Sequence, residues 1–169
     1  MNKELYLAGG CFWGTEHYLK QIRGVEKTEV GYANGHTENP TYHDVCTGET
    51  GFVETVHVVY DTSVLSLKKL TEIYFESIDP TSLNKQGGDC GTQYRTGIYY
   101  VDPSDEPILR ETFDEKQRGL GGAPMRVELL PLKNFFRAED YHQDYLQKNP
   151  AGYCHLPVTL FEYAKEANP

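Results

Sequence analysis

The stretch Leu5–Gly14, LYLAGGCFWG, predicts the point at which a first strand ends and a first helix begins. The apolar residues 5–8 indicate the strand, and residues 15–22 indicate the helix after a glycine-rich bend. Cys11 is therefore expected near a helix N-terminus, where free N–H groups and the helix dipole lower the pKa of a thiol. Isolated cysteines are more often buried and inert, but the two glycines before Cys11 and the two aromatic rings after it favour a reactive thiol.

Strands and helices alternate along the chain beyond this junction. The β-α-β-β-α-β order predicts an α+β protein with a ferredoxin-like two-layer sandwich, in which helices cover one face of the sheet. Loops are expected at 34–51 and 82–92, and an irregular tail at the C-terminus. The other expected elements are strands at 25–32, 52–60, 96–101 and 125–130 and helices at 66–78, 107–118 and 138–147.

Composition predicts a single globular domain over residues 1–169. The chain is 38% hydrophobic and 24% charged, so it can bury its own core, and a monomer is expected although no feature rules out a dimer. A net charge of −9 argues against nucleic acid or an anionic membrane as partner. No secretion signal opens the chain and no apolar stretch is long enough to span a bilayer, so we expect a cytoplasmic protein.

Glu54 is an acid in an otherwise apolar row of the third expected strand. Alternation puts it on one face with Phe52, Val56, Val58 and Tyr60. If that face is buried, desolvation raises the pKa of Glu54 and suits it to donate a proton near neutral pH. The alternative is an edge-strand glutamate that reaches solvent and has no such role.

Tyrosines are frequent in this chain, and two of them lie in expected loops. Of the 13 tyrosines, Tyr42 follows Asn39-Pro40 and Tyr94 follows a glycine-rich segment. A phenol keeps its proton at pH 7 and can donate a hydrogen bond to a polar oxygen inside an aromatic pocket. Either tyrosine taken alone is more simply explained by packing, but together with Cys11 and Glu54 they indicate a site.

The remaining thiols are Cys46, Cys90 and Cys154. Cys154 follows the breaker-rich segment 149–153, and a thiol on such a segment can resolve an oxidised cysteine. The alternative is that Cys154 has no function, and the same interpretation applies equally well to Cys46 and Cys90. The chain has no C-x-x-C pair and no Cys/His spacing typical of zinc, so no metal is expected.

Five motifs in one order resemble the peptide methionine sulfoxide reductases of the A class over nearly the whole chain. They are residues 10–14, 39–42, 51–56, 86–95 and 138–143. The resemblance implies that the Cys11 thiolate attacks the sulfur of the S epimer of methionine sulfoxide, free or in proteins. It implies that Glu54 protonates the sulfoxide oxygen while Tyr42 and Tyr94 hydrogen-bond it.

The resemblance also assigns the other site residues. Phe12 and Trp13 would bind the methyl group of the substrate, and Asp89 would hold its backbone. Cys11 would be left as a sulfenic acid, which Cys154 would convert to a disulfide that thioredoxin reduces, with no metal or organic cofactor. Such an enzyme serves protein repair under oxidative stress.

Two departures from the family pattern leave questions open. Phe52-Val53 replaces the His-Ala that commonly precedes the catalytic acid, which makes the surroundings of Glu54 more apolar and can narrow the pocket. Cys90, beside Asp89, is close enough in sequence to the active-site loop to compete with Cys154 as the resolving thiol.

Two other classes of function compete with the reductase. A cysteine-dependent hydrolase or acyl transferase would pair Cys11 with a base such as His17 or His142, but it leaves Glu54 and the tyrosines unexplained. A non-catalytic module would recognise methionine through the Phe12 and Trp13 rings without turning it over.

Overall fold

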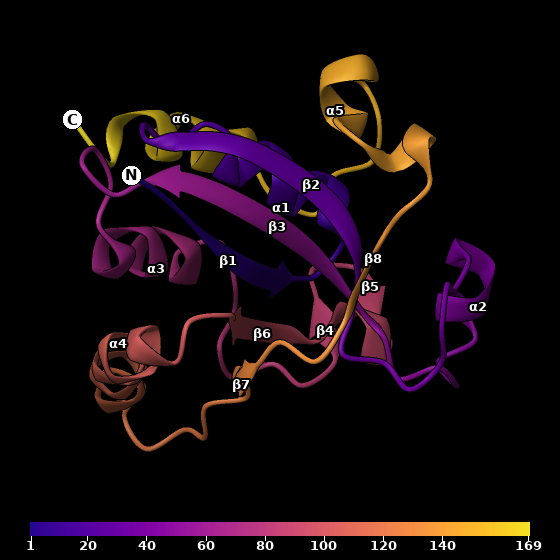
Figure 1. Ribbon diagram of the computed structural model, residues 1–169, viewed down its shortest axis with the longest axis horizontal. Coiled ribbons are helices and arrows are strands. Elements are labelled where there is room, and N and C mark those ends of the chain that lie inside the picture. The colour runs from indigo at the N-terminus through magenta and orange to yellow at the C-terminus, as the bar shows by residue number, and fades with distance from the viewer.

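Six strands form one mixed sheet in the computed structural model, which describes residues 1–169 (Figure 1). They are β1 (Asn2–Gly9), β2 (Val25–Ala33), β3 (Val53–Asp61), β6 (Thr96–Tyr100), β7 (Glu128–Pro131) and β8 (Phe135–Arg137), in the spatial order β7-β6-β1-β3-β2-β8. Neighbouring strands are antiparallel except β6 and β7, which are parallel. β1 and β3 are therefore central, and residues 5–9 of β1 and 53–56 of β3 are buried.

Six α-helices and a small hairpin complete the fold. The helices are α1 (Phe12–Leu19), α2 (Tyr42–Cys46), α3 (Leu67–Phe75), α4 (Glu106–Arg118), α5 (Tyr145–Lys148) and α6 (Val158–Glu166), and the hairpin is β4 (Lys85–Gln86) with β5 (Asp89–Cys90). Three short 3-10 turns lie at Thr92–Tyr94, Pro103–Asp105 and Asp140–His142. None of the helices has the length and apolar character needed to cross a membrane.

Alternation along β1 divides the interior into two clusters. Leu5 and Leu7 point into a cluster of 25 buried residues that lies between the sheet and the helices α1 and α3. Tyr6 and Ala8 point to the opposite face, where a cluster of five buried residues is covered by Leu132 and Phe135. Burying one leucine stabilises the fold by about 2 kcal/mol, so the larger cluster fixes α1 firmly on the sheet.

The α+β class predicted from the sequence is confirmed. The predicted alternation is present as β1, α1, β2, β3, α3 and β6, with the spatial order β6-β1-β3-β2 among its strands. The finer ferredoxin-like description stays a prediction. Ser66 begins α3 as expected for a helix cap, since its side chain accepts a hydrogen bond from the N–H of Lys69 at 3.1 Å.

Four predictions about secondary structure were wrong. The C-terminal tail is not irregular but contains α6, whose Ala164 is fully buried and whose Phe161 packs edge-on against His17 of α1. The expected loops contain α2 and the β4-β5 hairpin, and the strand β8 was missed. The helix expected at 138–147 is broken because Asp144 adopts a left-handed conformation with φ of 52°.

Candidate active site

Cys11 occupies the two-residue link between β1 and α1. Gly10 makes the bend with φ of +92°, a conformation that favours glycine, and Cys11 is the residue that caps α1. The hydroxyl of Thr15, in α1, donates a hydrogen bond to the carbonyl of Gly9 at 3.1 Å and so stabilises the link. The junction predicted from residues 5–14 is thus present, and Cys11 is only 7% exposed.

The predicted lowering of the pKa of Cys11 is wrong for this state. Burial is the largest influence and raises the pKa of the Cys11 thiol, followed by the negative charge of Glu54. The backbone N–H groups of Trp13 and Gly14 act in the expected direction and lower that pKa, but they are outweighed. The helix start therefore favours the thiolate, while the closed pocket keeps the resting thiol protonated.

Glu54 is buried on the central strand β3, at 1% exposure, so the solvent-reaching alternative is excluded. Its Oε1 accepts a hydrogen bond from the N–H of Phe12 at 3.1 Å, and its Oε2 has no hydrogen-bond partner. Burial raises the pKa of Glu54 to about 8, with the Phe12 N–H opposing the shift. The carboxyl group is therefore mostly protonated at pH 7, with a proton free to be donated.

Tyr42 is held at the start of α2 by Glu139. The N–H of Tyr42 donates to one carboxylate oxygen of Glu139 at 2.9 Å, and the hydroxyl of Tyr32 donates to the other at 2.8 Å. Burial, the first cause, and the charge of Glu54 both raise the pKa of the Tyr42 phenol. Tyr42 is thus an unionised donor within electrostatic reach of Glu54.

Tyr94 approaches the same place from the loop before β6. The next residue, Arg95, fixes that loop by donating to the carbonyl of Gly51 at 2.9 Å and to Glu128 at 2.9 Å. Burial and then the negative charges of Glu54 and Cys11 raise the pKa of Tyr94. Both predicted tyrosines are thus within electrostatic reach of Glu54, and Tyr94 is also within reach of Cys11.

The two aromatic rings after Cys11 have different surroundings. Phe12 is buried at 1% exposure, with its ring centre 5.7 Å from that of Tyr32 and 5.2 Å from that of His142. Trp13 is half-buried and stacks on Tyr145 with ring centres 3.7 Å apart. Its indole N–H donates to Nδ1 of His142 at 2.9 Å, so the orientation of the indole is fixed.

Asp89 and the C-terminal segment meet at the mouth of the site. The hydroxyl of the exposed Tyr153 donates to Oδ2 of Asp89 at 3.0 Å. The negative charge of Asp89, on the β4-β5 hairpin, raises the pKa of Cys11 after the larger effects of burial and of Glu54.

Cys154 lies against the first turn of α1. A Cβ atom added at Gly14 would lie 3.0 Å from the Sγ of Cys154, so the missing side chain of Gly14 makes room for this thiol. Cys154 is half-buried, whereas Cys46 and Cys90 are exposed at the end of α2 and on the hairpin, and all four thiols are free. The structure thus brings Cys154 to the helix that Cys11 begins.

A match to a sequence family covers almost the entire chain. Residues 3–168 match the model of the family described as peptide methionine sulfoxide reductase. The chain belongs to the peptide methionine sulfoxide reductase family. The curated "Peptide methionine sulfoxide reductase MsrA" of Lachnoclostridium phytofermentans is 53% identical over 167 residues, which are 99% of this chain and 100% of the relative.

Solved structures of family members have the same fold. The reduced form of Mxr1 from Saccharomyces cerevisiae superposes with a TM-score of 0.86 at 41% identity, over 91% of this chain and 89% of that one. Mxr1 in complex with Trx2 gives a TM-score of 0.62 at 26% identity, over 92% and 87% of the two chains.

Sequence reasoning missed the residues that hold this reductase site together. Glu139 supports Tyr42, His142 orients Trp13, and His155 packs beside Cys154. Glu139 and His142 lie in the motif 138–143. That motif suggested no role for Glu139, and His142 was considered only as a base in the hydrolase alternative. Their roles depend on contacts between segments far apart in sequence.

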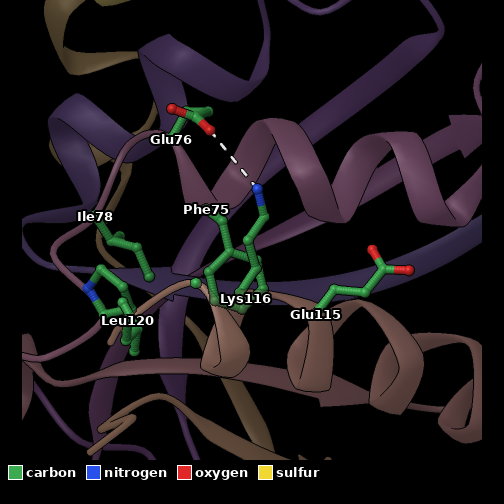
Figure 2. Close-up of a pocket in the computed structure, with 8 residues that line it drawn as sticks. Phe75, Glu76, Ile78, Glu115, Lys116 and Leu120 are labelled. Atoms are coloured by element: carbon green, nitrogen blue, oxygen red, sulfur yellow. Dashed lines mark ion pairs between the residues drawn. The ribbon is translucent and has the colours of Figure 1, made fainter. Parts of the chain in front are cut away.

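The cavity between α3 and α4 lies outside this site. Figure 2 shows its mixed lining, in which Phe75, Ile78 and Leu120 are apolar and Lys116 reaches across to Glu76. The amine nitrogen of Lys116 and the carboxylate of Glu76 are 3.7 Å apart. No cysteine lines this cavity, so it does not serve the thiol chemistry.

Proposed function

We propose that this chain reduces the S epimer of methionine sulfoxide to methionine, with Cys11 as the nucleophile and Glu54 as the proton donor. Thiol-dependent reduction of methionine sulfoxide, with recycling by thioredoxin, is the activity of this reductase. The observation that carries the assignment of residues is the buried carboxyl of Glu54. It is tied through Oε1 to the N–H of the residue after Cys11, with its Oε2 unpartnered.

The first step transfers the sulfoxide oxygen to the enzyme. Cys11 gives up its thiol proton as it attacks the sulfur of the substrate, and the sulfoxide oxygen takes a proton from Oε2 of Glu54 as negative charge builds on it. The proton from Cys11 passes to the carboxylate of Glu54, so the acid is restored at the end of the step. Tyr42 and Tyr94 donate hydrogen bonds to the same oxygen, which lowers the energy of the transition state. Methionine leaves, and Cys11 is left as a sulfenic acid that carries the oxygen.

Binding of the substrate uses both faces of the site. The half-buried Trp13, with Phe12 behind it, supplies apolar surface for the methyl group of the sulfoxide. Asp89, which accepts a hydrogen bond from Tyr153 at 3.0 Å, is placed to accept another from the backbone N–H of the substrate. Phe52 packs edge-on against Phe136 at 5.7 Å between ring centres, which supports an apolar environment for Glu54 beside it.

Recycling proceeds through Cys154. Its thiol attacks the sulfur of the oxidised Cys11, a disulfide forms, and water is released. Thioredoxin then reduces the disulfide by thiol exchange. Support comes from the contact of Cys154 with Gly14 of α1 and from the solved complex of the relative Mxr1 with Trx2.

The test is methionine formation from the separated R and S sulfoxides, with dithiothreitol or thioredoxin as reductant. We expect turnover of the S epimer alone and no turnover by Cys11→Ser. Cys154→Ser should keep the dithiothreitol reaction and lose the thioredoxin reaction, while the control variants Cys46→Ser and Cys90→Ser keep both. Loss of recycling in Cys90→Ser instead would assign the resolving thiol to Cys90.

The competing functions make different predictions. A hydrolase needs a histidine base on Cys11, but Nδ1 of His142 already accepts the indole N–H of Trp13, and the ring of His17 packs against Phe161 of α6. A binding module would keep its affinity in Cys11→Ser and would form no methionine in the intact chain. Methionine formation by the intact chain rejects this module.

We further propose a monomeric, single-domain enzyme of the cytoplasm. The chain buries a cluster of 25 residues without a partner, and a reducing compartment suits four free thiols. Light scattering after size-exclusion chromatography tests the monomer, for which a mass near 19.2 kDa is expected.

A further inference from the structure

His155, the residue after Cys154, is inserted among glycines at the base of the active site. A Cβ atom added at Gly10 would lie 3.1 Å from its Nε2, and one added at Gly14 would lie 3.0 Å from its Nδ1. A Cβ atom at Gly87 would lie 3.1 Å from the Cβ of His155. Gly10 and Gly14 thus leave the space that the imidazole ring fills, and Gly87 leaves room for the Cβ and backbone of His155, which together fix the ring at the start of α1.

The hydrogen bonding of the ring determines its tautomer. Nε2 of His155 lies 2.9 Å from the carbonyl oxygen of Gly9, and a carbonyl can only accept a hydrogen bond. Nε2 therefore carries the hydrogen, and Nδ1 of the neutral ring is left with a lone pair. This Nδ1 is buried and has no hydrogen-bond partner.

The ring is neutral at physiological pH. Burial lowers the pKa of His155, while the Gly9 carbonyl and the negative charge of Asp89 act in the opposite direction. Asp89, on the hairpin, is the charged side chain that acts on the ring. Nδ1 is thus available as a proton acceptor near pH 7.

The thiol of Cys154 needs such an acceptor. Its Sγ and Nδ1 of His155 each lie 3.0 Å from the same point, the position of a Cβ at Gly14. Burial raises the pKa of Cys154, so the thiol holds its proton until it attacks. The N–H of Leu156 already points at Sγ from 3.4 Å and would stabilise the thiolate once it forms.

We propose that Nδ1 of His155 accepts the thiol proton of Cys154 as Cys154 attacks oxidised Cys11. The inference rests on the proposed function, which supplies the sulfenic acid. The bond between the two sulfurs forms, and the S–O bond of the sulfenic acid breaks. The departing hydroxide takes up the proton that His155 received, so one water molecule is released and the imidazole returns to its neutral form. No further oxidant or reductant is needed.

His17 is the matched control within the same region. It also has a buried, unpartnered Nδ1, and it lines a cavity of about 660 Å³ together with Cys154, Leu146 and Phe161. Its ring packs edge-on against Phe161 at 4.6 Å between ring centres and lacks the fixed hydrogen bond to a carbonyl that sets the tautomer of His155. We expect it to have no part in disulfide formation.

The experiment compares His155→Gln with His17→Gln after mixing with one equivalent of S-sulfoxide and no reductant. A glutamine amide can still donate to the Gly9 carbonyl but supplies no base. Methionine release and loss of the first free thiol report the first step, and loss of the second free thiol reports disulfide formation. We expect His155→Gln to release methionine at the normal rate and to lose the second thiol more slowly by about 10²-fold, as expected for removal of a general base. His17→Gln should match the intact chain in both.

Chemical rescue separates base chemistry from a structural role. In His155→Ala, added imidazole should restore fast loss of free thiols, whereas a ring needed only for packing would not be replaced in this way. The inference is overturned if His155→Gln forms the disulfide at the normal rate, or if His17→Gln forms it slowly instead. It is also overturned if imidazole does not rescue His155→Ala. Absence of methionine release in the intact chain would instead reject the proposed function.

Discussion

The backbone N–H of Phe12 donates to Oε1 of Glu54 at 3.1 Å, so the residue that follows the nucleophile also holds the acid. The carbonyl oxygen of a carboxylic acid is a better acceptor than its hydroxyl oxygen, so this hydrogen bond favours the proton on Oε2, the oxygen without a partner. Any movement of the link between β1 and α1 therefore displaces the thiol and the proton donor together.

Replacement of the acid should stop the first chemical step without unfolding the protein. In Glu54→Gln we expect methionine formation to fall by about 10²–10⁴, the usual contribution of a general acid. The control is Glu16→Gln, because Glu16 is equally buried at 1% exposure but binds Thr28 and Asp144 outside the site. Normal activity in Glu54→Gln with dithiothreitol as reductant would contradict the role of Glu54.

The same variant should change how stability depends on pH. Burial raises the pKa of Glu54 from an ordinary value near 4.5 to about 8, so between these values the folded state binds a proton that the unfolded chain releases. Stability of the intact chain therefore decreases as pH rises through this window, and the contribution reaches on the order of 4 kcal/mol above it. The melting temperature of Glu54→Gln minus that of the intact chain should therefore become larger as the pH is raised from 4.5 to 8. An unchanged difference would contradict the raised pKa.

The two phenols should share the stabilisation of the sulfoxide oxygen. Loss of one oriented donor from such a site commonly costs about 10²–10³ in rate. One phenol remains in each single variant, so Tyr42→Phe and Tyr94→Phe should each lower the rate of methionine release by less than this factor. The double variant should lower the rate by the full factor. Single-turnover release of methionine measures the effect. Tyr163→Phe, on the exposed face of α6, serves as the control.

Filling the space at Gly14 should separate reduction from recycling. A Cβ atom there would lie 3.0 Å from both Sγ of Cys154 and Nδ1 of His155, so Gly14→Ala must displace the C-terminal segment. We expect one methionine per chain at a near-normal rate, loss of turnover with thioredoxin, and a loss of stability of about 1–3 kcal/mol. Gly119→Ala is the control, since its nearest contacts are carbonyl oxygens at 3.5 and 3.9 Å. Full thioredoxin-dependent turnover in Gly14→Ala would show that the packing is unimportant.

The indole of Trp13 should report the state of the site. It is the only tryptophan in the chain, and it is fixed by its hydrogen bond to His142 at 2.9 Å and its stacking on Tyr145. His142→Leu removes the acceptor and should weaken substrate binding by roughly tenfold, equivalent to about 1.4 kcal/mol for one hydrogen bond. Titration of tryptophan fluorescence with the sulfoxide in a Cys11→Ser background measures this. Equal affinity with and without His142 would reject the positioning role.

Local sequence patterns predicted the centre of the site because its main features are local. The change from apolar residues to glycines at 9–10 predicted the position of Cys11, and the apolar neighbours of Glu54 pointed to its burial. The pKa of Cys11 was predicted with the wrong sign, because the sequence reveals a helix start but not how completely the surrounding elements enclose the thiol.

The residues that support the site could not be predicted from the sequence, because they contact residues that are far away along the chain. Glu139 accepts hydrogen bonds from Tyr42 and Tyr32, which precede it by 97 and 107 positions in the sequence. The strand β8 forms because three of its residues pair with β2. The helix α6 is likewise defined by its packing on α1, where Phe161 meets His17. No periodicity within a short window contains this information.

The two thiols of the proposed relay belong to parts of the molecule with different local stability. Cys11 follows a central strand paired on both sides, whereas residues 149–157 around Cys154 lie outside every helix and strand. Segments of this kind open at lower free energy than a sheet and are cleaved first by proteases. Limited proteolysis should therefore yield a nicked protein that still reduces one sulfoxide per molecule but no longer completes a catalytic cycle with thioredoxin.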